Sequence, residues 1–96
     1  MKNTDSQIIQ HIIKYCSLIS STIGRFGDSF DIFLRDFDYQ HSISFCICQI
    51  GELTNNFSQD AKELFVGQIP LVQIKGLRNR LVHGYLSIDL RIVWNT

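Results

Sequence analysis

Apolar residues recur at every third or fourth position in three long stretches of the chain, which predicts three long amphipathic helices. The first helix is expected to begin after Thr4 or Asp5, because either side chain can cap a helix. It should end at Gly27, a residue type that commonly follows the last helical turn. The second long helix is expected to run from about Tyr39 to Phe57, since its apolar residues again repeat with a period near 3.6.

The third long helix is expected to start at Pro70 and stop at Gly84. Proline suits the first turn of a helix because the N–H that it lacks would have no partner there. Shorter helical segments, each beginning at an aspartate or serine able to act as a cap, are expected at residues 28–34, 58–65 and 87–95. No internal repeat interrupts this series of helices.

The apolar faces of these helices predict one helical core. Its expected members are Ile8, Ile12, Cys16, Ile19, Ile43, Ile47, Ile50, Leu77 and Leu81. The predicted fold class is therefore all-α, an up-and-down helical bundle of about four main helices. The length of 96 residues predicts a single domain that covers residues 1–96.

The composition narrows the class of protein. The formal net charge is zero, which argues against coating a nucleic acid through bulk electrostatics, so any contact with a polyanion must be local. The three cysteines, Cys16, Cys46 and Cys48, lie among apolar residues and are interpreted as reduced, buried thiols. The chain opens without a signal peptide and has no apolar run long enough to span a membrane, so we expect a cytoplasmic protein.

Metal binding is not predicted. His41, Cys46 and Cys48 are the residues that would suggest it, but two cysteines two positions apart on a helix point about 200° apart and cannot share a tetrahedral ion. No cofactor is expected either.

Positive charge gathers in one window of this neutral chain. No Asp or Glu occurs in residues 64–88, whereas Lys75, Arg78 and Arg80 all do, and His83 follows them. One interpretation is a solvated helix end, where cations complement the helix dipole. The other is a local phosphate-binding patch, in which Lys75 and Arg80 would attract RNA.

Helical spacing supports the second interpretation. His83 stands four residues after Asn79 and three after Arg80, so each of these two residues is its neighbour on a helix. Arg78 is five residues before His83 and approaches the same point if its side chain wraps round or if a second subunit supplies it. An arginine can bind a phosphate through two hydrogen bonds, and a histidine side chain can exchange protons near neutral pH. The two side chains together suit RNA transesterification without a metal.

The stretch "RNRLVHGY" resembles the R-x4-6-H signature of the HEPN superfamily, with Asn79 as the polar residue that follows the arginine. More narrowly, the chain resembles the HepT-like toxins, which are paired with minimal nucleotidyltransferase (MNT) antitoxins. The segments that carry this resemblance, in the order that the family shows, are "GRFGDSFDIFLRD", "QIGEL", "IP", "GLRNRLVHGY" and "SIDLRIVW". Members of that family usually continue the last helix well beyond the position of "IVWNT".

The resemblance implies a function and roles for individual residues. Arg78 and His83 match the catalytic pair of HEPN ribonucleases, and Asn79 matches the polar residue that supports them. It implies a homodimeric, metal-independent endoribonuclease, the toxin of a type VII-like toxin–antitoxin system. Tyr85 matches the tyrosine to which the nucleotidyltransferase antitoxin attaches AMP. The alternative is a non-catalytic subunit that serves such a nucleotidyltransferase as binding partner or substrate.

Overall fold

The computed structural model describes residues 2–83 and 89–95 and contains only helices there. They are α1 (Asn3–Phe26), α2 (Phe30–Arg35), α3 (Phe37–Asn55), α4 (Gln59–Phe65), α5 (Leu71–His83) and α6 (Leu90–Asn95). The predicted all-α fold is confirmed. None of the described helices is long and apolar enough to span a membrane.

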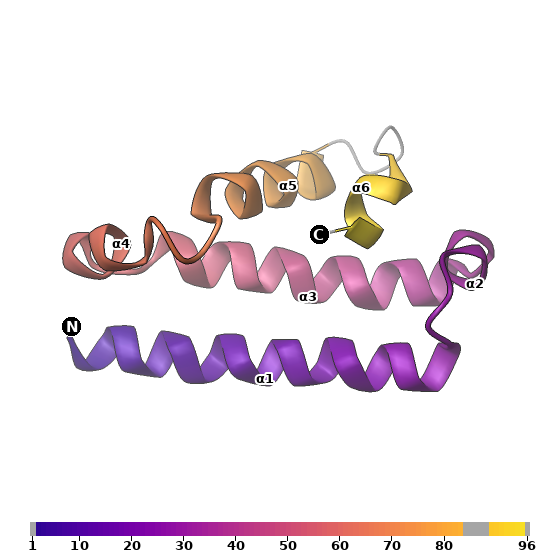
Figure 1. The fold of residues 1–96 in the computed structure, drawn as a ribbon, viewed down its shortest axis with the longest axis horizontal. Coiled ribbons are helices and arrows are strands. Elements are labelled where there is room, and N and C mark those ends of the chain that lie inside the picture. Colours follow the sequence, from indigo (N-terminus) through magenta and orange to yellow (C-terminus); the bar gives the residue numbers. More distant parts are fainter. Residues whose placement is uncertain (1, 84–88, 96) are drawn as a thin grey trace.

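Helix α3 forms the middle of the structure (Figure 1). It packs against α1 on one side and against α5 on the other, and these two contacts are the largest between any helices described. The short helices α2 and α4 lie at opposite ends of α3, and α6 lies beyond the end of α5 (Figure 1). The residues of α5 that pack against α3 therefore fix the directions in which the other residues of α5 point.

Local capping explains where the helices begin. The carboxylate of Asp36 accepts a hydrogen bond from the backbone N–H of Tyr39 at 3.1 Å, so α3 starts two residues earlier than the sequence pattern predicts. The hydroxyl of Ser58 accepts from the N–H of Ala61 at 3.2 Å, as the sequence predicts for α4. The first residue of α5 follows Pro70. The predicted break at Gly84 and the predicted start at 87 lie outside the described residues.

The largest buried cluster joins α2, α3, α5 and α6. Its members are Phe33, Tyr39, Ile43, Ile47, Leu77, Leu81 and Val93. A smaller cluster of Ile8, Phe57 and Ala61 joins the start of α1 to α4. Five of the predicted core residues (Ile8, Ile43, Ile47, Leu77 and Leu81) are confirmed as buried.

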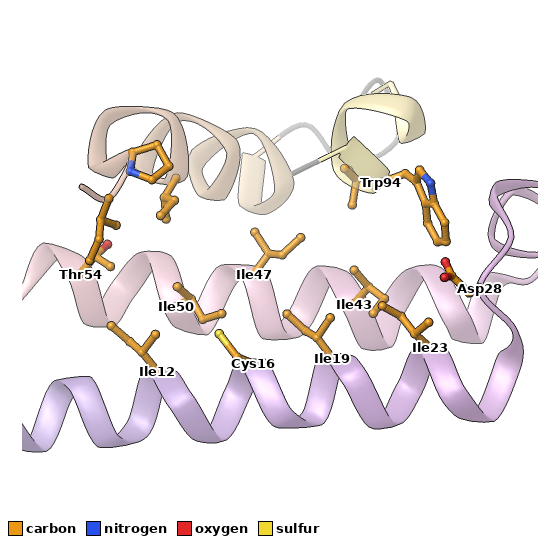
Figure 2. Close-up of a pocket in the computed structure, with 14 residues that line it drawn as sticks. Ile12, Cys16, Ile19, Ile23, Asp28, Ile43, Ile47, Ile50, Thr54 and Trp94 are labelled. Atoms are coloured by element: carbon orange, nitrogen blue, oxygen red, sulfur yellow. The ribbon is translucent and has the colours of Figure 1, made fainter. Parts of the chain in front are cut away.

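The prediction that Cys16 belongs to the core is wrong, because its side chain is exposed. Ile12, Ile19 and Ile50 are only half-buried. All four line a groove of about 740 Å³ that runs between α1, α3 and the start of α5 (Figure 2). They are apolar and face inward, but the described part of the chain puts no helix over them. Of the three cysteines, only Cys46 is buried.

A buried carboxylate ties the start of α1 to the start of α4. Asp5 accepts hydrogen bonds from the backbone N–H and the hydroxyl of Ser58, at 2.8 and 2.6 Å, and from the N–H of Lys2 at 2.9 Å. The Ser58 hydroxyl, and then its N–H, lower the pKa of Asp5 below its ordinary value because they stabilise the charged form. These hydrogen bonds therefore tie α1 to the start of α4 at the end of the structure opposite α2.

Candidate active site

Helix α5 carries every described residue of the predicted site, and its buried face sets their directions. Leu77 and Leu81 are buried in the main core cluster. Because successive residues of an α-helix turn by about 100°, Asn79 and His83 lie about 120–160° away from these two leucines. Both are exposed, as that geometry requires. The predicted histidine therefore stands on the open side of α5.

The cations of α5 do not form one patch. Lys75 and Arg78 lie on the same flank of the helix, about 60° apart, whereas Arg80 lies about 160° from Arg78. Arg80 lines a smaller depression beside Ile92 and Asn95 of α6. The single positive patch that the sequence suggested is therefore divided between two flanks, with His83 between them.

Arg78 is held at its flank by residues of two helices. Its guanidinium makes an ion pair with the carboxylate of Glu52 on α3. Its Nη1 donates a hydrogen bond to the side-chain oxygen of Asn79 at 2.9 Å. Arg78 therefore has no acidic residue near it in the sequence, but in the folded chain the carboxylate of Glu52 lies beside it. Among contacts between described residues, none joins Arg78 to His83.

A glycine makes the position of Arg78 possible. A Cβ placed on Gly51 of α3 would lie 2.6 Å from the Cβ of Arg78, closer than two such carbons can approach. The bare backbone of α3 therefore lets α5 come close at this point. Gly51 and Glu52 are adjacent, so one turn of α3 both receives the base of the Arg78 side chain and binds its charged end.

The Arg78 arrangement adds little net stability. Its side chain is 28% exposed and that of Glu52 is 47% exposed, and ion pairs open to solvent contribute about 0–1 kcal/mol. The Nε–H of Arg78 is buried and has no hydrogen-bond partner among the described residues, which costs about 1–3 kcal/mol. The cost is at least as large as the gain. A buried polar group kept at a net cost in stability is typical of functional sites.

The other reactive groups near the site are poorly suited to chemistry. Burial raises the pKa of the Cys48 thiol; the positive charge of Arg78 lowers it less, and Glu52 adds a smaller upward effect. The thiol therefore stays protonated near neutral pH and is a poor nucleophile. Within residues 2–83 and 89–95, no three His, Cys, Asp or Glu side chains are grouped so that they could hold a metal ion. Tyr85 lies outside the described residues.

Sequence reasoning did not pair Gly51 or Glu52 with Arg78. Both lie in the segment "QIGEL", where a glycine occupies a helical position that most residue types would stabilise better. A glycine inside a predicted helix is a signal of close packing. That signal does not identify Arg78 as the neighbour, because the pairing of α3 with α5 depends on the tertiary fold.

The described residues thus form an all-helical fold in which one helix carries an exposed histidine and an arginine held by an ion pair. The family model described as "Ribonuclease HepT-like" matches residues 7–96. The chain belongs to this family, and it is an RNA endonuclease of the HEPN type. No solved structure matches the chain.

Relatives with curated names agree with this family. The chain is 27% identical over 93 residues to a protein of Caldanaerobacter subterraneus subsp. tengcongensis named "Putative RNase", a match that covers 97% of this chain and 80% of the relative. It is 28% identical over 96 residues to "Probable ribonuclease HepT" of Thermococcus cleftensis, covering 100% of this chain and 84% of the relative.

Replacing Gly51 by alanine should destabilise the protein, because the new methyl group would push Arg78 and α5 away from α3. Overpacking of this kind costs about 1–3 kcal/mol, more than the gain of up to about 1 kcal/mol from better helix propensity. Gly24→Ala is the matched control, since Gly24 is also helical and has no atom within 4 Å of the added Cβ. Urea unfolding should show a loss for Gly51→Ala and a gain for Gly24→Ala. Equal stability gains in both variants would contradict the close α3–α5 contact.

Proposed function

We propose that the protein cleaves RNA at a site made by Arg78, Asn79 and His83, without a metal ion. The observation that carries this proposal is the arrangement on α5, where His83 is exposed on the open side and Arg78 is fixed at the flank by Glu52 and Asn79. An accessible acid–base group and a fixed cation are the two elements that phosphate transesterification requires.

The proposed reaction uses the 2′-OH of the RNA as its nucleophile. The 2′-oxygen attacks the adjacent phosphorus while the bond from phosphorus to the 5′-oxygen breaks, so a 2′,3′-cyclic phosphate and a 5′-OH are formed. His83 accepts the proton of the 2′-OH or donates one to the leaving 5′-oxygen. Arg78 binds the phosphate oxygens and stabilises their growing negative charge. Asn79 orients Arg78, and Lys75 and Arg80 attract the RNA backbone.

We further propose that two copies of the chain form the cleft. Arg78 and His83 lie about 140° apart around α5, and the Arg78 side chain turns toward α3. One helix therefore does not bring the two groups to the same phosphate. A two-fold symmetric dimer, the commonest form of homo-oligomer, would place Arg78 of one copy near His83 of the other.

The same proposal includes the biological role. The chain would be the toxin of a HepT/MNT-type system, inactivated when a nucleotidyltransferase antitoxin attaches AMP to Tyr85. This rests on the match of "RNRLVHGY" to the family signature, in which Tyr85 stands two residues after His83. A phosphate and a nucleoside attached there would compete with RNA for the cations and would block the cleft.

Replacing His83 by alanine should lower RNA cleavage by about 10²- to 10⁴-fold, the usual contribution of an acid–base group. His11→Ala is the matched control, because His11 is an exposed histidine on α1, away from α5. The rates are measured on a defined RNA with EDTA present. Full activity of His83→Ala, or loss of all cleavage in EDTA, would rule out this mechanism.

Incubation with a cognate MNT-type nucleotidyltransferase and ATP should add AMP to the chain and abolish cleavage. Intact-mass measurement checks the addition, and Tyr85→Phe should remain unmodified and active. Mass gain on a wild-type protein that never cleaves RNA would favour the alternative, a non-catalytic substrate subunit. Full activity after stoichiometric modification would contradict the proposed switch.

A further inference from the structure

Glu52 meets Arg78 at a place where α3 and α5 approach each other closely. Its carboxylate is on the residue next to Gly51, whose backbone receives the Cβ of Arg78. The base of the arginine is thus fixed by packing, and its charged end is fixed by Glu52 and Asn79. Three contacts define the direction of one side chain.

We propose that Glu52 is a positioning residue for Arg78 in RNA cleavage, an inference that rests on the proposed function. Glu52 does not contact the substrate in this scheme. It keeps the guanidinium on the flank of α5 from which Arg78 can meet a phosphate held at the cleft between two copies.

The geometry leaves Arg78 able to bind a phosphate while Glu52 holds it. An arginine has five N–H groups. One on Nη1 serves Asn79, one on Nη2 faces Glu52, and Nε–H is buried. One N–H on each terminal nitrogen therefore remains, and two such groups match the two oxygens of a phosphate. Glu52 is thus a support for the arginine and not a competitor of the RNA.

A purely structural role for Glu52 is less consistent with the same contacts. Both side chains are partly open to solvent, where ion pairs contribute little to stability. The approach of α5 to α3 is already set by Gly51 and by the buried leucines of α5. Loss of Glu52 should therefore leave the fold in place and release the guanidinium.

The experiment compares Glu52→Ala, Glu52→Gln and Glu63→Ala in steady-state RNA cleavage. Glu52→Ala should lower kcat by about 10- to 100-fold with little change in KM, because a displacement of about 1 Å at a catalytic group has an effect of this size. Its melting temperature should match that of Glu63→Ala, a change at an exposed residue of α4. Glu52→Gln should restore most of kcat, since its amide oxygen still accepts a hydrogen bond from Nη2.

A second comparison is made in the Arg78→Ala background, where Glu52→Ala should have no further effect on kcat. An increase in cleavage by Glu52→Ala would overturn the inference and make Glu52 a competitor of the phosphate. An unchanged kcat, or the same loss with and without Arg78, would overturn it as well. If His83→Ala is as active as the wild type in this assay, the proposed function itself has failed. If His83→Ala loses activity as expected and only the Glu52 variants differ from their expected results, the proposed function stands and the role of Glu52 is wrong.

Discussion

The close approach of α5 to α3 at Gly51 is the contact on which the site depends. Because Gly51 has no side chain, the Cβ of Arg78 can lie against the backbone of α3. Leu77 and Leu81, buried on the same side of α5, fix the rotation of the helix. The direction of His83 then follows from helix geometry alone, on the side that faces away from α3.

Periodicity was enough to predict the helices, because burial of one apolar face decides the structure of each long stretch. It also identified Ile43, Ile47 and Leu77 as core residues. It failed for Cys16, since an inward-facing position is buried only if another helix covers it, and the described residues leave that groove open (Figure 2). A pattern along one helix contains no information about such a neighbour.

The candidate site shows the same limit. The motif around Arg78 and His83 is visible in the sequence, and the residues of α5 that it marks are where helical spacing puts them. The pairing of Arg78 with Glu52 is not visible, because these residues are far apart in the chain and meet only when α3 packs on α5. Counting charges along the sequence therefore overestimated the positive patch. In the folded chain, Glu52 neutralises Arg78, and Arg78 lies on a different flank of α5 from Arg80.

Family membership makes the protein a ribonuclease, and the positions of Arg78 and His83 limit how the proposed site can be assembled. Arg78 and His83 point in different directions from one helix, so our account requires two copies for one cleft. The most direct test mixes the impaired variants Arg78→Ala and His83→Ala, after each is shown by size measurement to be a dimer. Random exchange of subunits should restore about a quarter of wild-type cleavage, because half of the dimers are mixed and each mixed dimer keeps one of its two arginine–histidine pairs. Cleavage no higher than that of the two variants measured separately would contradict the account.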